Sequence, residues 1–261
     1  MIFAEWRAIF EAAESHFGAS QLAIFPGSYV IRSKAKPSRA IVFVHGFNGC
    51  PTKTWESYHD LLANDPRFRD ANLYYYSYDS LHTGLDLAVQ ELSAFLTHIH
   101  ASGDFEELIC VGHSLGGLML RLAIVRAWKA KERWVDNVRM LLVAPAQCGA
   151  RISQLILSSV GAGLQGIILF APRYRWVILD DLERTSPQIV GLRTLLESLP
   201  PPIDSQLIPI ALVVPPSDRV VHQELLPGDP KFSKVNSTNH GSISKCNGPT
   251  DSRYLALTSF L

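Results

Sequence analysis

The chain has 261 residues, nearly half of them hydrophobic, and its 24 Lys and Arg residues balance 24 Asp and Glu residues. This length and composition can fill one large core, so we expect a single domain over residues 1–261, and the lack of a basic stripe argues against nucleic acid as a partner. The four cysteines, Cys50, Cys110, Cys148 and Cys246, form no Cys-x-x-Cys pair, which argues against a zinc site or a disulfide scaffold.

Residues 2–17 carry apolar side chains at helical spacing, which predicts an amphipathic helix. We expect a surface helix packed on its apolar side. A membrane-surface anchor is the alternative, although the polar face is acidic where anionic lipid favours Lys or Arg. Glu5, Arg7, Glu11 and Glu14 interrupt the apolar run that a signal peptide needs. The sequence therefore predicts a cytoplasmic protein.

Apolar runs then alternate with stretches of helical periodicity. The runs that predict strands are residues 21–25, 28–32, 40–44, 72–78, 108–111, 137–144, 207–214 and 231–235. Helices are predicted over residues 53–62, 81–100, 115–129 and 251–261, with another that ends at Leu199. Pro26-Gly27 predicts a hairpin at a sheet edge. The alternation indicates an α/β fold, with a mostly parallel, doubly wound sheet flanked by helices and ligands bound at the carboxyl ends of its strands.

The strand over residues 108–111 breaks into Gly112-His113-Ser114-Leu115-Gly116 and then into a helix. Small residues at Gly112 and Gly116 let neighbouring backbone pass close, and this turn pushes the serine side chain out above the sheet edge. Ser114 is therefore the candidate nucleophile, with a glycine-rich packing turn as the alternative. The N–H of Leu115, at the helix N-terminus, is a candidate donor to an oxyanion formed by attack of Ser114.

Residues 152–171 contain no charged side chain and are rich in Leu and Ile. The segment is long enough to cross a bilayer, but it lies between two strands of one sheet and carries glutamines, serines and glycines. We therefore expect residues 151–200 to form a helical cap or lid within the domain. In that case residues 152–171 would line an acyl pocket or make peripheral contact with a membrane.

Two later loops carry the other groups that a serine nucleophile needs. In folds built around this kind of turn, an acid and then a histidine follow the serine along the chain. Asp218 follows the strand over residues 207–214 and is the candidate acid, with Glu224 as its competitor; Asp204 precedes that strand and would lie at the opposite edge. His240 follows the last strand and is the candidate base, with His222 as its rival.

Several motifs together resemble one group of proteins. They are Val-Phe-Val-His-Gly-Phe-Asn-Gly with Lys-Thr-Trp, Tyr-Ser-Tyr, Gly-His-Ser-Leu-Gly-Gly-Leu, Ala-Pro-x-x-x-Gly, and Asn-His-Gly-Ser-Ile-Ser-Lys with Asp-x-x-Tyr. From about Ile41 to the C-terminus the chain resembles the serine esterase and lipase-like families of α/β-hydrolases. Their relatives include GPI inositol deacylases and a phosphatidylglycerol-remodelling protein with a serine active site.

This resemblance implies the α/β-hydrolase fold and makes the N–H of Phe47, after His-Gly, the second oxyanion donor. We interpret His45 as a brace for that loop, a buried core histidine being the alternative. Residues 144–149 depart from the Thr-Pro-His-x-Gly-Ser loop that the family usually has. The resemblance therefore assigns that loop no role.

The function predicted from these residues is that of a serine carboxylic-ester hydrolase, an esterase or lipase-like enzyme. Ser114, Asp218 and His240 form its triad, Phe47 and Leu115 its oxyanion hole, and it needs no cofactor and no metal ion. The expected substrate is a small-molecule or lipid acyl ester. Phospholipase, thioesterase, amidase and transacylase activities use the same machinery and stay open, as does a non-catalytic interaction module on the same fold.

Overall fold

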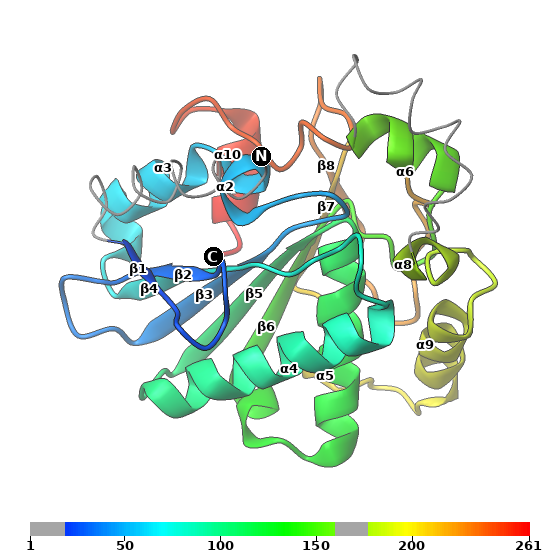
Figure 1. Cartoon of the computed structure of the whole chain (residues 1–261), viewed down its shortest axis with the longest axis horizontal. Helices are drawn as coiled ribbons and strands as arrows, with labels where there is room; N and C mark the ends of the chain where they lie inside the picture. The colour runs from blue at the N-terminus through cyan, green and yellow to red at the C-terminus, as the bar shows by residue number, and fades with distance from the viewer. Residues whose placement is uncertain (1–18, 160–176) are drawn as a thin grey trace.

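The computed structural model describes residues 19–159 and 177–261 (Figure 1), so the helix expected over residues 2–17 and residues 160–171 of the apolar segment lie outside the described chain. Eight strands of the described chain form one sheet in the order β1-β2-β4-β3-β5-β6-β7-β8. They are β1 (Ala19–Gln21), β2 (Tyr29–Ile31), β3 (Arg39–Val44), β4 (Ala71–Tyr76), β5 (Glu107–His113), β6 (Val138–Val143), β7 (Ala211–Val214) and β8 (Phe232–Lys234).

The sheet is mostly parallel, as expected. The β1–β2 hairpin is antiparallel and lies at one edge, where β2 also pairs antiparallel with β4. The other neighbouring strands run parallel to each other. Parallel neighbours place their carboxyl ends at the same edge, so the loops after β3, β5, β6, β7 and β8 converge there.

Both faces of the sheet are buried. In β3, Ala40, Val42 and Val44 belong to one apolar cluster, whereas Ile41 and Phe43 belong to the other. All five are fully buried. A strand with alternate side chains in two cores must be apolar throughout, which explains its unbroken run of hydrophobic residues.

Helices cover both faces (Figure 1). One face carries α4 (Leu85–Ser102), α5 (Leu115–Ala130) and α9 (Pro187–Ser198), and the other carries α2 (Pro51–Trp55), α3 (Tyr58–Asn64) and α10 (Ser252–Thr258). The remaining helical segments are η1 (Pro66–Phe68), η2 (Arg133–Asn137), α6 (Ile152–Ser159), α8 (Val177–Asp180) and η3 (Ser205–Leu207). The doubly wound arrangement is therefore confirmed.

The single helix expected over residues 53–62 is wrong, because the chain forms α2 and α3 instead. Pro51 begins α2, where its missing N–H and fixed φ fit a first helical turn. Glu56 has a φ of 27°, outside the right-handed helical region, so the chain turns before α3 begins.

The strand expected over residues 207–214 begins only at Ala211. Ser205–Leu207 is a 3-10 turn, and Pro209 has no N–H to donate to a ladder. Two other helices also differ in their bounds from those expected, since α4 begins after Gly84 and α10 ends at Thr258.

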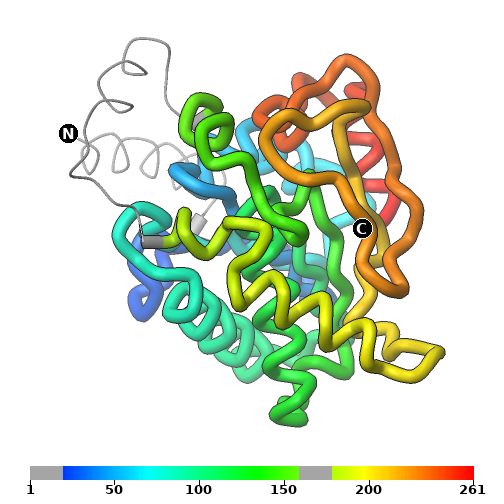
Figure 2. The backbone as a smooth tube through the Cα atoms, turned by 90° about the vertical axis from the view of Figure 1, so that its right-hand side faces the viewer, coloured from blue at the N-terminus to red at the C-terminus, as the bar shows by residue number. Residues whose placement is uncertain are grey.

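The segment between β6 and β7 contributes α6, α8 and α9, which follow one another down the right-hand side of Figure 1, the side that faces the viewer in Figure 2. The turn after α8 is tied to the start of α4, because the N–H of Leu85 donates to Asp181 Oδ2 at 3.1 Å. Within residues 19–159 and 177–261, no helix has the length and apolar character needed to span a membrane.

Candidate active site

Ser114 lies at the junction of β5 and α5. Its N–H donates to the carbonyl of Val143 at 3.0 Å, which continues the pairing of β5 with β6 by one residue. Its φ of 54° and ψ of −119° reverse the chain before α5 begins at Leu115. The serine therefore stands at the carboxyl edge of the sheet, where the other loops converge.

Two glycines keep this junction compact. A Cβ added to Gly116 would lie 2.4 Å from the carbonyl oxygen of His45, and one added to Gly46 would lie 2.9 Å from Cβ of Ser114. Neither position has room for a side chain, since real Cβ contacts this short do not occur without movement of the backbone. Close approach between the loop after β3 and the start of α5 is thus the physical reason for glycine in both motifs.

His240 is in hydrogen-bonding contact with the serine. Its Nε2 lies 2.9 Å from Ser114 Oγ, although 126 residues separate the two along the chain. The turn that carries His240 is shaped by the side chain of Asn239, whose Oδ1 accepts from the N–H groups of Gly241 at 3.0 Å and Ser242 at 2.9 Å. An Asx turn of this kind replaces regular secondary structure in holding a loop.

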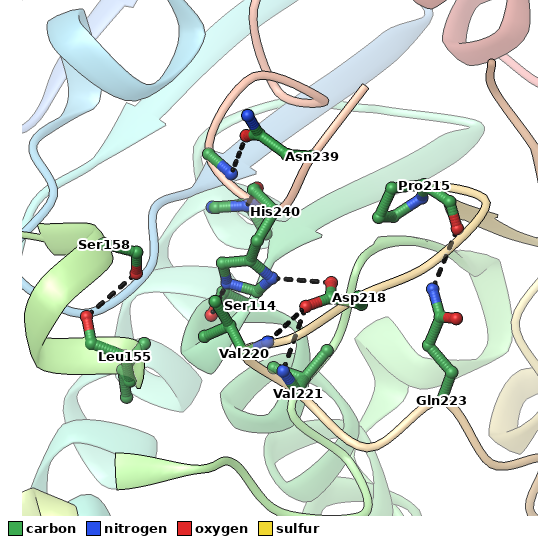
Figure 3. A network of polar contacts seen from close by, with 12 residues as sticks. Ser114, Leu155, Ser158, Pro215, Asp218, Val220, Val221, Gln223, Asn239 and His240 are labelled. Atoms are coloured by element: carbon green, nitrogen blue, oxygen red, sulfur yellow. Dashed lines mark hydrogen bonds and ion pairs between the residues drawn. The ribbon is translucent and has the colours of Figure 1, made fainter. Parts of the chain in front are cut away.

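Asp218 completes the hydrogen-bonded chain (Figure 3), with Oδ2 2.8 Å from His240 Nδ1. Its fully buried side chain also accepts, at Oδ1, from the N–H groups of Val220 at 2.7 Å and Val221 at 3.1 Å. Burial alone would raise the pKa of Asp218, but the bond to His240 and these two backbone donors lower it below its ordinary value. The carboxylate therefore stays ionised and holds the imidazole with a proton on Nδ1.

The competing residues lie elsewhere. The carboxylate of Glu224 forms ion pairs with Arg184 and Arg193. Partial burial would raise the pKa of Glu224, but the hydrogen bond from Arg193 and the positive charges of both arginines keep it below its ordinary value. The N–H of His222 bonds to the carbonyl of Gly149, and Asp204 accepts from Trp128 Nε1 at 2.7 Å. The structure thus brings Ser114, Asp218 and His240 together and gives their rivals other partners.

The two candidate oxyanion donors lie in the two segments that pack closely here, Leu115 at the start of α5 and Phe47 in the loop after β3. Leu115 is buried and opens α5, a helix of 16 residues. The carbonyl of Gly46 accepts from His45 Nδ1 at 2.9 Å and from the N–H of Gly49 at 3.1 Å. In a trans peptide the N–H points opposite to the carbonyl, so the N–H of Phe47 is directed away from His45 and Gly49. That Phe47 and Leu115 bind an oxyanion stays a prediction.

His45 contacts the loop that it was expected to brace. Burial lowers its pKa to about 4, against the raising effect of its bond to the Gly46 carbonyl, so the ring is neutral and has one N–H to give. The ring stacks on Tyr78 with centroids 4.4 Å apart, and the Tyr78 hydroxyl donates to the His45 carbonyl at 3.0 Å. His45 is therefore both buried in the core and bonded to the Gly46–Phe47 peptide.

Sequence reasoning missed three contacts in the surroundings of these residues. His113 Nε2 donates to the carbonyl of His240 at 2.9 Å. Arg151 Nη1 donates to the carbonyl of Asp218 at 3.3 Å. Gln147, in the loop without an assigned role, belongs to a buried ion-pair network. Each partner is far away in sequence, so no local pattern could have indicated the contact.

The loop over residues 144–149 packs directly behind the serine. The N–H of Ala146 donates to the carbonyl of Ser114 at 3.0 Å, and Gln147 Oε1 accepts from Arg121 Nη1 at 2.6 Å. Gln147 Nε2 in turn donates to Asp229 Oδ2 at 2.7 Å. The loop therefore joins the serine, helix α5 and the segment before β8.

A buried carboxylate, an imidazole and a hydroxyl in this order can move the hydroxyl proton to the imidazole and leave a nucleophilic oxygen. In the part of the chain that the structure describes, no group of three or more His, Cys, Asp or Glu residues could hold a metal ion.

The sequence profile of the alpha/beta hydrolase family matches residues 41–237. Among curated proteins, none matches this chain. The mature form of the Bacillus licheniformis lipase BlEst2 is similar with a TM-score of 0.56 and 15% identity, covering 84% of this chain and 93% of that one. The phospholipase PlaB from Legionella pneumophila, solved with thio-NAD, has a TM-score of 0.51 and 19% identity over 69% of this chain and 38% of its own.

A third similar structure is 2-hydroxy-6-oxo-6-phenylhexa-2,4-dienoate hydrolase from Rhodococcus sp. strain RHA1. Its TM-score is 0.52 at 14% identity, and the match covers 90% of this chain and 94% of that one. At such identities these three likenesses show a shared fold.

Proposed function

The chain belongs to the alpha/beta hydrolase family, and we propose that it is a serine esterase that hydrolyses acyl esters through Ser114, His240 and Asp218. The observation that carries the proposal is the continuous hydrogen-bonded chain from Asp218 to His240 at 2.8 Å and from His240 to Ser114 at 2.9 Å. Burying a carboxylate costs free energy, so packing alone does not explain Asp218 at this position. Nucleophilic catalysis does explain it, because the carboxylate orients a histidine that contacts a serine hydroxyl.

In the proposed reaction, His240 Nε2 takes the proton of Ser114 Oγ as the oxygen attacks the acyl carbon. The N–H groups of Phe47 and Leu115 bind the oxyanion, and the imidazolium, stabilised by Asp218, returns the proton to the departing alcohol. Water then attacks the acyl-enzyme with His240 as base, and the carboxylic acid leaves as Ser114 regains its proton. The atoms and protons balance without a cofactor.

The segment over residues 151–200 supports an acyl substrate and is proposed as a cap. Helix α6 begins directly after Arg151, whose Nη1 donates to the carbonyl of Asp218 at 3.3 Å, and Figure 3 draws its residues Leu155 and Ser158 in the same close view as the triad. Leu155 is buried and Ile156 is half-buried, and we propose that apolar side chains of this helix form one wall of the acyl site. If residues 152–171 contact a membrane, the enzyme would act on lipid, as a phospholipase or a relative of the GPI inositol deacylases does. A thioesterase or transacylase would use the same apolar wall for its acyl group.

We expect KM for p-nitrophenyl esters to fall as the acyl chain is lengthened from acetate, because each buried methylene gains about 0.8 kcal/mol, until the pocket is full. The series is measured with and without phospholipid vesicles. Activation by vesicles would support a lipase, and rates that stay flat or fall beyond acetate would contradict the apolar wall and indicate a small polar ester.

A fluorophosphonate probe run in parallel separates an enzyme from an interaction module. The probe should form a covalent adduct on Ser114, identified by peptide mass, and should not label Ser114→Ala. The matched control is Ser102→Ala, an exposed serine at the end of α4, which should label normally. A folded wild-type chain that neither labels nor hydrolyses any ester would favour the interaction module.

A further inference from the structure

We propose that His113 is a positioning residue that holds the main chain of His240, and so sets the distance between the base and the nucleophile. The proposal rests on the proposed function of the same site. His113 precedes Ser114 in the chain, ends β5, and has no contact in the reaction described above. Its side chain is nevertheless buried beside the triad.

The ring of His113 is held on three sides. Its Nε2 lies 2.9 Å from the carbonyl oxygen of His240, and the two imidazole rings are 5.1 Å apart. The ring of Trp55 meets it edge-on at 6.4 Å. A Cβ added to Gly46 would lie 3.2 Å from Nδ1, so backbone closes the third side.

The chemistry of the contact determines which nitrogen carries the proton. A carbonyl oxygen can only accept, so Nε2 must be the N–H nitrogen. Burial, and then the electrostatic influence of the neighbouring His240 imidazole, lower the pKa of His113 to about 3. The ring is therefore neutral at any pH at which an esterase works, and its only N–H is given to the His240 carbonyl.

The contact closes a cycle. His113 holds the main chain of His240, the His240 side chain meets Ser114, and Ser114 is joined to His113 by a peptide bond. The distance between Ser114 and His240 is therefore set by this short cycle of contacts. It does not depend only on the conformation of the loop that carries His240. This matters because a shift of about 1 Å at reacting atoms can cost about 100-fold in rate.

Other contacts keep the loop folded without His113. Asn239 shapes the turn from within, Arg253 Nη1 donates to the carbonyl of Ser242 at 3.3 Å, and Lys245 pairs with Glu56 at 2.5 Å. Loss of the His113 bond should therefore move His240 and leave the loop in place. A positioning role predicts a change in kcat with little change in KM or stability.

The test compares His113→Leu, which removes the donor, with His113→Gln, whose amide N–H can reach the same carbonyl. We expect kcat for p-nitrophenyl butyrate to fall about 10- to 100-fold in His113→Leu, with KM within about twofold, and to recover largely in His113→Gln. His100→Leu, at the end of α4, is the histidine control and should match wild type. Wild-type kcat in His113→Leu, or equal losses in both variants, would overturn the proposal.

Proton NMR supplies a readout that needs no substrate. The Nδ1–H of His240, bonded to Asp218, should give a low-field signal that shifts or broadens in His113→Leu and persists in His113→Gln. If the wild-type protein hydrolyses no ester, the proposed function fails, yet the NMR comparison still tests His113. An unchanged signal in His113→Leu would overturn the positioning role of His113 independently of activity. Thermal unfolding of each variant serves as the control that it is folded.

Discussion

Ser114→Ala is expected to lower kcat for an acyl ester by about 10⁴- to 10⁶-fold, because members of a serine triad act as a unit and removal of one abolishes the covalent route. Alanine keeps the Cβ that approaches Gly46 and removes only the oxygen that meets His240. The variant should therefore fold, bind substrate and leave a small residual rate. The measurement is kcat and KM with p-nitrophenyl butyrate, alongside thermal unfolding.

A matched pair of acid variants belongs to the same experiment. Asp218→Asn removes the charge that holds His240 and should reduce kcat by about 10⁴-fold, since the amide favours the wrong tautomer. Glu224→Gln alters a carboxylate that pairs with two arginines and should leave kcat near wild type. The reverse outcome would transfer the acid role to Glu224, and a fully active Ser114→Ala protein would contradict the proposed function altogether.

Asp229→Ala is expected to destabilise the protein by about 3–5 kcal/mol, because it leaves the arginine charge buried without its partner. The side chains of Arg121 and Asp229 are both 0% exposed, with Arg121 Nη2 2.7 Å from Asp229 Oδ1. Asp229 Oδ2 also accepts from Gln147 Nε2 and from the N–H of Leu226 at 2.8 Å. Such a loss corresponds to a Tm lower by roughly 10 °C for a chain of this size.

Two further variants show whether the cost comes from an unpaired charge. Arg121→Met combined with Asp229→Leu removes both charges and should recover part of the stability, since replacing a whole buried pair by apolar groups is often neutral. The remaining loss comes from Gln147 and the N–H of Leu226, which lose their acceptor. Asp86→Ala breaks the exposed pair with Arg126 and should change stability by less than about 1 kcal/mol. A Tm for Asp229→Ala equal to that of wild type would refute the expectation.

Local patterns were enough to predict the number and order of the strands, the two long helices α4 and α5, and the fold. The apolar run of β3 and the strand, turn and helix around Ser114 are encoded within a few residues of each other. Parallel pairing then places the ends of β5, β7 and β8 at one edge, which is why Asp218 and His240 could be named beside Ser114. The structure brings these three together as the chain order predicted.

Features that depend on distant partners could not be predicted. The bond from His113 to the His240 carbonyl spans 127 residues, and nothing near either residue indicates it. Arg121 belongs to a helix with an apolar pattern, and its burial depends on Asp229, which lies in another loop. The break at Glu56 escaped because residues 53–62 have helical spacing throughout, and spacing alone carries no information on a single unusual φ.

The backbone conformation of Ser114 lowers the stability of the fold, although the proposed activity requires a serine at this position. A non-glycine residue held at φ 54° and ψ −119° costs of order 1–3 kcal/mol, a noticeable share of the 5–15 kcal/mol or so by which domains are typically stable. Glycine would adopt these angles without that cost, yet it has no oxygen to offer. The most stable sequence for this backbone is therefore not an active one, and a search for thermostable variants that ignores turnover will favour loss of the serine.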